Sequence, residues 1–419
     1  MKELPRFIAF CCACTLLSFC SSRDEIKEHH FQTYLHDGIT IAETTGGPRY
    51  EGELFEYVPI MDLELSESEE TMLFDPSSII CDSDGWIYIK DNGNGDVVVF
   101  DPEGQFHTRF GRYGMGPGEF QYAEFLCTVD DMVYIFDRPS LRTSRFNREG
   151  TLIDMVTTQQ PLNALFPLAG GDQLHLSYHD ASRGSVRADG NGGSWCDAVR
   201  LSSSGDTIWA WASDPLNNLF THSVSLGGNA LLARSRYPYS LRPETFYVPD
   251  LGIVAMAYHE PQLDILDLDG QVQLRIRIEV GDLSVTEEDR RAVLEAYDEV
   301  INDPEQDPGR VATFIEYRKG MQFGETKALW DRLIYSDEGY LFLRPRVSEQ
   351  GVAIADEYAG FIVLSPEGEY LGRTKPPEGN NASIGGGKLV INNEDAETGE
   401  FTITVYEIRS SIAGLDYPN

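Results

Sequence analysis

Short runs in which apolar and polar residues alternate cover most of the chain, and the clearest of them recur. The runs at residues 85–91 (GWIYIKD) and 131–137 (DMVYIFD) lie 46 positions apart, and the same spacing matches Phe100 with Phe146 and Cys81 with Cys127. Each unit contains four such runs separated by turn residues. Alternation with a period of two predicts strands, and four strands in about 45 residues are typical of a propeller blade, so the pattern predicts an all-β propeller.

The turn after the third strand of the unit returns several times. It reads FDPEG at 100–104 and FNREG at 146–150, and weaker copies are LSSSG at 201–205, LDLDG at 266–270 and LSPEG at 364–368. These copies indicate five blades, and residues 386–408 supply a sixth that lacks an outer strand. We expect residues 54–65 to provide that strand, because it would close the ring and leave no unpaired sheet edge at the seam.

We therefore divide the chain into a signal peptide at 1–19, a tether at 20–50, a six-bladed propeller at 51–410 and a C-terminal tail at 411–419. In the signal, Lys2 and Arg6 precede a short apolar run that ends at Cys20. This run is too short to span a bilayer as a mature helix. It predicts a lipoprotein with Cys20 as the lipidated residue, and an ordinary secretory signal is the alternative.

The net charge of the chain limits the classes of partner that it can bind. There are 33 Lys and Arg against 68 Asp and Glu, a formal net charge of −35, so a nucleic-acid partner is not expected. After the signal only Cys81, Cys127 and Cys196 remain, without the spacing of a metal site. We expect free thiols at Cys81 and Cys127, since equivalent positions on neighbouring blades lie farther apart than the ~5.5–6 Å of bonded cysteines.

One stretch resembles a known family. Residues 110–120 (FGRYGMGPGEF), residues 133–137 (VYIFD) and Arg142 are similar to the NHL repeat, and specifically to six-bladed propeller lipoproteins of Bacteroides-type bacteria. Asp96 departs from the pattern, which has Arg there, as at Arg142. The resemblance implies an outer-membrane lipoprotein on the cell surface or the periplasmic side, but it implies no single activity, because propellers serve many roles.

Long insertions indicate a working surface. They lie at 180–194, 213–242, 282–322 and 344–357, all in the two loop classes that open on the same face of a propeller. Function commonly resides on loops carried by a rigid scaffold, so this face is the candidate ligand face, although neutral elaboration is also possible. Its candidate residues are Asp91, Asn94, Arg112, Tyr113, Asp137, Arg142, Tyr237 and Tyr239.

The insertion at 282–322, between blades four and five, is predicted to be a helical hairpin. Ser284 and Glu287 have capping-box spacing, Val293 and Tyr297 belong to an apolar stripe, and Pro308 can begin a second helix. The segment holds eleven acidic and five basic residues, so its outer side should be negative. The hairpin could be a lid over the channel or a decoration of the rim.

Signatures of catalysis are scarce. No Gly-x-Ser-x-Gly or His-Glu-x-x-His motif occurs, and the glycine-rich loop at 111–118 leads into a strand, which favours a structural crossing over a phosphate site. His175 and His179 share a strand face and are weak metal candidates. The oxygen-rich residues 91–96 (DNGNGD) lack EF-hand spacing and fit a turn better than a calcium site.

Two functions remain open. The favoured one is a lipid-anchored cell-envelope propeller that binds a ligand or an envelope protein through its insertion-rich face, without a cofactor and without catalysis. The alternative is a metal-dependent propeller hydrolase or lyase of the NHL type, with a divalent cation in the central channel.

Overall fold

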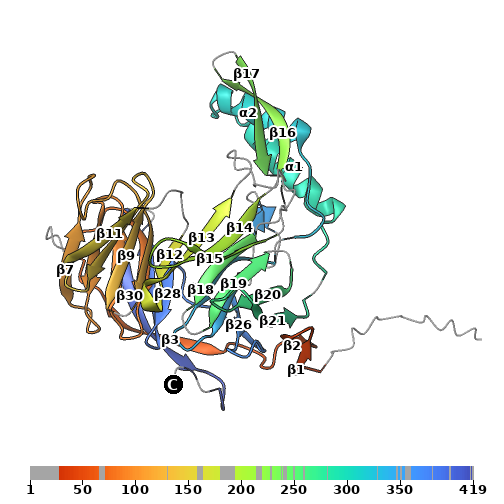
Figure 1. The fold of residues 1–419 in the computed structure, drawn as a ribbon. Coiled ribbons are helices and arrows are strands. Elements are labelled where there is room, and N and C mark those ends of the chain that lie inside the picture. The colour runs from red at the N-terminus through yellow and green to blue at the C-terminus, as the bar shows by residue number, and fades with distance from the viewer. Residues whose placement is uncertain are drawn as a thin grey trace, which may run out of the picture.

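The computed structural model describes residues 28–65, 71–129, 131–157, 164–179, 194–213, 219–226, 229–236, 238, 243–248, 251–257, 260–280, 282–327, 329–345, 348–349, 352–353, 360–379, 381–395, 398–415 and 417. The expected signal peptide and Cys20 lie outside these residues. The described chain forms antiparallel sheets around a ring, and the all-β, six-bladed propeller predicted from the repeat is confirmed (Figure 1).

Each blade is built mainly from four neighbouring strands. Blade one contains β4 (Pro76–Cys81), β5 (Ile87–Asp91), β6 (Asp96–Phe100) and β7 (Phe106–Gly111), and blade two contains β8 (Ala123–Val129), β9 (Met132–Asp137), β10 (Arg142–Asn147) and β11 (Leu152–Thr157). Blade three contains β12 (Ala164–Pro167), β13 (Gln173–His179), β14 (Trp195–Leu201) and β15 (Thr207–Ala212). Blade four contains β18 (Pro243–Val248), β19 (Gly252–Ala257), β20 (Gln262–Leu266) and β21 (Val272–Ile278).

Blades five and six complete the ring. Blade five contains β22 (Trp330–Tyr335), β23 (Leu341–Pro345), β26 (Phe361–Leu364) and β27 (Tyr370–Thr374). Blade six contains β28 (Asn381–Gly385), β29 (Lys388–Glu394), β30 (Phe401–Ser410) and β3 (Phe55–Asp62). Its outer strand β3 thus comes from the N-terminal part of the chain and pairs antiparallel with β30.

The recurring turn has the same structure in five blades. Its glycine has a positive φ in each, at Gly104, Gly150, Gly205, Gly270 and Gly368. The register between the third and fourth strands also shifts just before each turn. A left-handed glycine beside a bulge lets the two strands reverse tightly, so these glycines carry the repeat even where the other residues have diverged.

The N-terminal segment corrects the expectation of a tether at 20–50. Residues 30–36 and 39–45 form the hairpin β1 (His30–His36) and β2 (Ile39–Thr45), and β2 extends blade four by pairing in parallel with β21. The chain then follows β27, where Arg49 N donates to Tyr370 O, before it enters β3. We call residues 30–62 the N-terminal strap, because they line the outer edges of blades four, five and six in turn.

The hairpin of the strap, residues 30–45, was not predicted from the sequence because little of it is apolar. β1 is largely exposed, and in β2 the fully buried side chains are Ile41, Ala42 and Thr44. Thr44 Oγ1 accepts from Tyr370 N of blade five. The C-terminal tail is also packed: Tyr417 is 3% exposed and contacts Phe55 and Tyr340.

The core consists of apolar clusters between neighbouring blades. Blades one and two meet through Phe110, Phe120 and Phe146. Cys81, Cys127 and Cys196 are buried free thiols, which confirms the expectation for the first two. Their equivalence is wrong, however: Cys81 lies opposite Ile87, whereas Cys127 lies opposite Tyr134, one position off the 46-residue offset. Because a shift of one residue reverses the face of a strand, Cys81 contacts Gly385 of blade six while Cys127 contacts Leu165 of blade three.

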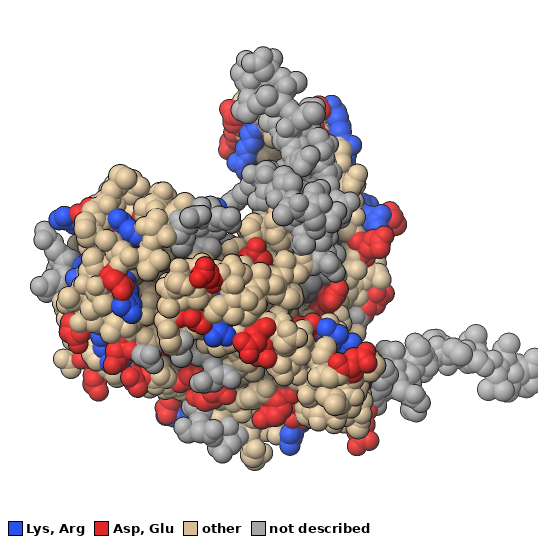
Figure 2. Space-filling model, in the orientation of Figure 1, with Lys and Arg blue, Asp and Glu red and all other residues tan. Residues whose placement is uncertain are grey.

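Three insertions stand on one face of the ring. They are the hairpin β16 (Leu219–Leu226) and β17 (Asn229–Arg236), the helices α1 (Glu287–Asn302) and α2 (Pro308–Gly320), and the hairpin β24 (Ser348–Glu349) and β25 (Val352–Ala353). We call this the insertion face; the opposite, plain face carries the turns at 101–105 and 365–369. Acidic side chains gather along the lower part of the molecule in Figure 2, toward the plain face.

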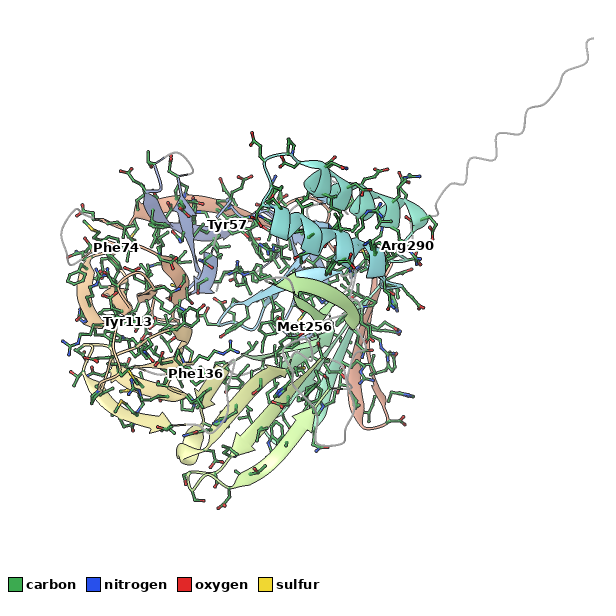
Figure 3. All side chains as sticks on the ribbon, turned by 90° about the horizontal axis from the view of Figure 1, so that it is seen from above. Tyr57, Phe74, Tyr113, Phe136, Met256 and Arg290 are labelled. Carbon is green, nitrogen blue, oxygen red and sulfur yellow. The ribbon has the colours of Figure 1, made fainter. Side chains whose placement is uncertain are left out.

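The helices have their own small core of Val293, Tyr297, Phe314 and Tyr317, with the rings of Tyr297 and Tyr317 stacked at 5.4 Å. The expected capping box at Ser284 and Glu287 is wrong: Thr286 caps α1 and pairs with Asp289, because the helix starts at Glu287. Seen from above, α1 and α2 lie to one side of the ring, toward the rim (Figure 3). In the described part of the chain, no helix is long and apolar enough to cross a membrane.

Candidate functional site

The inner strands of all six blades enclose a central cavity of about 260 Å³. Most of its lining is apolar, including Ile79, Leu126, Phe166 and Ile384. The polar groups on its wall are Cys81, Cys127, Thr128, Thr245, Tyr247, Arg332, Tyr335 and Ser383. A cavity of this size and lining can hold a small apolar molecule, but its chemistry depends on whether any of these groups is activated.

Burial holds two thiols and one phenol of the channel in their neutral forms. Burial raises the pKa of the Cys81 thiol to about 12, and it raises the pKa of Cys127 and Tyr335 as well. A nucleophilic thiol needs a lowered pKa, so these side chains are suited to packing rather than to covalent chemistry.

The two histidines named as weak metal candidates lie on β13 but have separate partners. His175 Nε2 is 3.0 Å from Gln173 Oε1, and burial lowers its pKa to about 4. His179 Nε2 is 2.6 Å from Asp197 Oδ2, and its ring stacks on Trp195 at 4.5 Å. Across the described residues, no group of three His, Cys, Asp or Glu side chains is placed to hold a metal ion.

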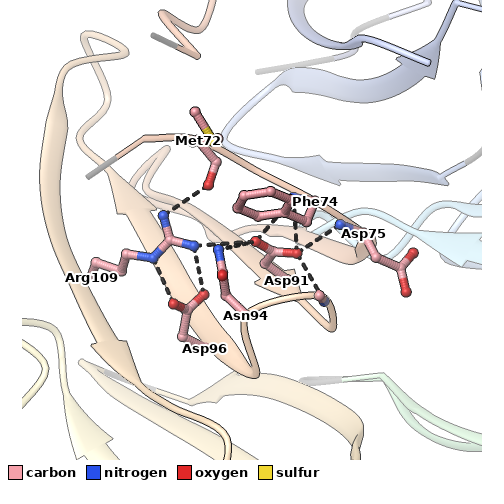
Figure 4. A network of polar contacts seen from close by, with 8 residues as sticks. Met72, Phe74, Asp75, Asp91, Asn94, Asp96 and Arg109 are labelled. Atoms are coloured by element: carbon pink, nitrogen blue, oxygen red, sulfur yellow. Dashed lines mark hydrogen bonds and ion pairs between the residues drawn. The ribbon is translucent and has the colours of Figure 1, made fainter. Parts of the chain in front are cut away.

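Asp91, expected on the ligand face, lies inside the fold. Its carboxylate is fully buried and accepts from the backbone N–H groups of Phe74, Asp75 and Gly93 (Figure 4). Asn94 Nδ2 and a guanidinium nitrogen of Arg109 also donate to it, at 2.9 and 3.2 Å. These donors occupy the oxygens that a calcium ion would need, which supports the interpretation of residues 91–96 as a turn.

Asp137 occupies the same place in blade two. It is fully buried and accepts from Gln121 N, Tyr122 N and Ser140 Oγ. Asp91 and Asp137 are therefore buried and, contrary to the expectation from the sequence, do not form part of an exposed ligand face. Each ends the second strand of its blade and anchors the chain that enters the first strand, and both oxygens of each carboxylate accept hydrogen bonds.

Arg142 and Arg112 organise the glycine-rich loop. Arg142 donates to the carbonyls of Met115 and Glu119, at 3.1 and 2.7 Å, and Glu119 in turn binds Arg112 and accepts from Gly116 N. At Gly111, with a φ of +89°, a side chain would collide with the ring of Phe120. The loop is thus a closed crossing between blades, as predicted.

Tyr113, like Arg112, is an expected ligand-face residue that reaches solvent, and it has neighbours that the sequence analysis missed. Phe74 and Tyr113 lie against Gly93 and Gly95, on the same turn of blade one. The two rings are 58% and 68% exposed, and Figure 3 shows both on the side of the ring away from the helices. Met115 and Tyr122, 68% and 53% exposed, lie on the same crossing between blades one and two as Tyr113. We call these four residues the aromatic patch; apolar residues within glycine-rich loops were the available signal.

The insertions converge on the same face. Helix α2 packs against β16, α1 approaches β25, and Gly324 N donates to Pro238 O at the base of the β16–β17 hairpin. Elements from three separate loops therefore form one raised assembly on this face of the ring (Figure 1). Tyr237, Tyr239 and most of the insertion at 180–194 lie outside the described residues.

Comparison with known proteins agrees with this fold. A family model described as a 6-bladed beta-propeller matches residues 52–161, which include β3 and the first two blades. The structure is similar to that of a Bacteroides fragilis protein considered to be exported, with 11% identity, a TM-score of 0.51, and coverage of 87% of this chain and 99% of that one. No curated protein matches.

Two further solved structures are more distant. A protein of the DUF4221 family from Bacteroides vulgatus has 12% identity and a TM-score of 0.48, with coverage of 86% of this chain and 99% of that one. An inactive variant of virginiamycin B lyase from Staphylococcus aureus has 10% identity and a TM-score of 0.36, with coverage of 84% and 88%. At such identities the likeness concerns the fold alone, so the site must be argued from its own residues.

Proposed function

We propose that the protein is a lipid-anchored propeller of the bacterial envelope that binds an envelope protein through its insertion face. The observation that carries this proposal is the convergence of α1 and α2 with the β16–β17 and β24–β25 hairpins into one assembly. Ordering three separate insertions against one another costs conformational entropy, and a function for the surface they form would explain why the chain retains that cost.

The aromatic patch adds a second contact region on the same face. Phe74, Tyr113, Met115 and Tyr122 are all more than half exposed. Exposed aromatic residues and methionine are enriched in protein interfaces, where they supply large contact areas. The patch and the insertion assembly lie on opposite sides of the channel mouth, so one partner could contact both.

The polar side of α1 would govern which partner fits. Glu287, Glu288 and Glu295 are highly exposed there, with side chains 91%, 86% and 69% accessible, and they outnumber their ion-pair partners Arg290 and Arg291. A basic or neutral surface on the partner is therefore favoured over an acidic one.

Anchoring through Cys20 and placement at the outer membrane rest on the sequence pattern and the resemblance described above. An exported location is in keeping with the likeness to the Bacteroides fragilis protein. The metal-dependent hydrolase or lyase has less support, because Cys81 and Tyr335 of the channel are neutral and His175 and His179 have separate partners.

Site-specific photo-cross-linking in intact cells tests the binding face. A photoreactive residue replaces Tyr113 or Glu288 on the insertion face, and Glu103 or Ser204, in turns of the plain face, in the matched controls. We expect discrete protein adducts from the first two positions and none from the controls. Adducts confined to the plain-face positions, or absent from all four, would refute the proposal.

A further inference from the structure

A cleft separates blades two and three at the plain-face side of the ring. It has a volume of about 530 Å³, larger than the central cavity, and lies within the ~300–1,000 Å³ range of small-molecule pockets. Its blade-two wall includes Tyr134, Thr143, Arg145, Asp154 and Val156. Its blade-three wall includes Leu165, Pro167, Leu168, Asp172 and Gln173.

The blade-two wall carries a polar row where blades one and two have an aromatic core. Arg145 on β10 lies directly between Tyr134 on β9 and Asp154 on β11 in the sheet register. Its Nη2 donates to Asp154 Oδ2 at 2.5 Å. The row therefore offers both donors and acceptors to the cleft, with the positive charge of Arg145 already balanced.

Two polar atoms of this wall lack partners. Thr143 is 4% exposed, and its Oγ1 has no hydrogen-bond partner among the described residues; neither does Nε of Arg145. A buried polar group left unsatisfied costs about 1–3 kcal/mol, which is why such groups are rare in folded proteins. Both atoms come from alternate positions on one strand, so they face the same space.

The facing wall is neutral as well. Asp172 pairs with Arg200 at 2.9 Å, and Gln173 bonds to His175. Leu165, Pro167 and Leu168 supply an apolar surface opposite Val156. With each charged residue of the cleft paired to one of opposite sign, a charged ligand would gain no unpaired counter-ion and would lose its hydration.

We propose that this cleft binds a small uncharged polyhydroxy compound of about monosaccharide size. The hydroxyls of the ligand would donate to Asp154 and accept from Arg145 Nε. Thr143 Oγ1 would form a hydrogen bond with another ligand hydroxyl, as donor or as acceptor. The apolar face of a sugar ring matches Val156 and Leu168. The site is separate from the insertion face and does not depend on the function proposed for it.

Calorimetry on the purified folded protein, with D-glucose, D-galactose and N-acetylglucosamine as neutral probes and D-glucuronate as the charged probe, tests the assignment. Thr143→Val removes the hydroxyl at constant shape, and Val156→Phe fills the cleft from a partly exposed position. The matched controls are Thr207→Val and Ile208→Phe, at exposed positions of β15 outside the cleft.

We expect at least one neutral sugar to bind, about tenfold more tightly than glucuronate, and each cleft variant to weaken it about tenfold or more while the controls do not. If Thr143→Val does not fold, Val156→Phe decides the question. The proposal is overturned if no neutral probe binds, if binding survives Val156→Phe, or if glucuronate binds best.

Discussion

Arg109 on β7 and Asp96 on β6 form a bidentate ion pair, with Nε to Oδ2 at 2.6 Å and Nη2 to Oδ1 at 3.0 Å. The same guanidinium donates to Met72 O and to Asp91. Arg142 of blade two likewise holds the carbonyls of the chain that enters its blade. Arg109, positioned by Asp96, therefore replaces the arginine that the repeat pattern has at position 96.

Moving the arginine from position 109 to position 96 tests whether Arg109 takes the place of the repeat's arginine. Arg109→Met leaves Asp96 buried without its counter-ion, so we expect a loss of about 3 kcal/mol in the free energy of unfolding. Adding Asp96→Arg, as at Arg142, should restore at least half of that loss, since it rebuilds the arrangement of blade two. Urea denaturation measures both. Arg291→Met, at an exposed arginine of α1, should change stability by less than about 0.5 kcal/mol. A double variant no better than Arg109→Met would contradict the exchange.

The N-terminal strap makes a second prediction. Ile41 is 1% exposed in β2, so Ile41→Ala should cost about 2–4 kcal/mol, measured by thermal or urea unfolding. Leu35→Ala, on the neighbouring strand but 74% exposed, is the matched control and should be nearly neutral. Equal, small losses of stability in both variants would show that this segment is a loose tether and not part of the folded propeller.

The two channel thiols report on different blade interfaces. Cys81 shares its cluster with Leu63, and Cys127 shares its cluster with Phe166. Leu63→Ala should therefore speed the reaction of Cys81 with a thiol reagent more than that of Cys127, and Phe166→Ala should do the reverse. Mass spectrometry of partly labelled protein gives both rates. Parallel acceleration of both thiols by each variant would mean that the ring opens only as a whole.

His175 should make stability fall in mild acid. Burial lowers its folded-state pKa to about 4 from the ordinary 6.5, so the unfolded chain binds the extra proton between these values. Its contribution is full above pH 6.5 and declines as the pH falls toward 4; between pH 6.5 and 5 the loss is on the order of 2 kcal/mol.

The titration is isolated by comparing variants. His175→Gln should remove that part of the pH dependence, whereas His36→Gln, at an exposed histidine, should not. Urea unfolding at pH 7, 6 and 5 gives the three curves. An unchanged slope in His175→Gln would show that this side chain does not titrate in the expected range.

Structural features that recur in every blade can be predicted from the sequence, whereas features that depend on contacts at one place in the fold cannot. The alternation and the five turn glycines, such as Gly104 and Gly270, identify the blades because both reflect backbone geometry that each blade needs. The β1–β2 hairpin of the strap was missed because Ile41 and Ala42 are too few to form a recognisable pattern. The position of Cys127 was missed because a one-residue difference in pairing leaves no trace in composition.

The candidate site was harder to predict for a related reason. Asp91 and Tyr113 look equally polar and loop-like in the sequence, but one is fully buried and the other is 68% exposed. Which of them meets solvent depends on Arg109, Phe74 and the entry segment of the blade. These contacts come from residues 15 to 20 positions away, and motif spacing does not encode them.

The orientation of the anchored protein is the last prediction. His29 bonds to Glu369 in a plain-face turn, whereas α1 and α2 rise from the opposite face (Figure 1). Only nine positions separate Cys20 from His29, a reach of at most ~3.3–3.6 Å each, so a lipid on Cys20 would hold the plain face near the membrane. In cells with the protein on the exposed leaflet, protease should cut the α1–α2 connection at 303–307 before the plain-face turns at 82–86 and 101–105. Detergent-solubilised protein, as the control, should lose the protection of those turns. Early cleavage of the plain face in intact cells would place the insertion face toward the membrane and remove it as a surface for an external partner.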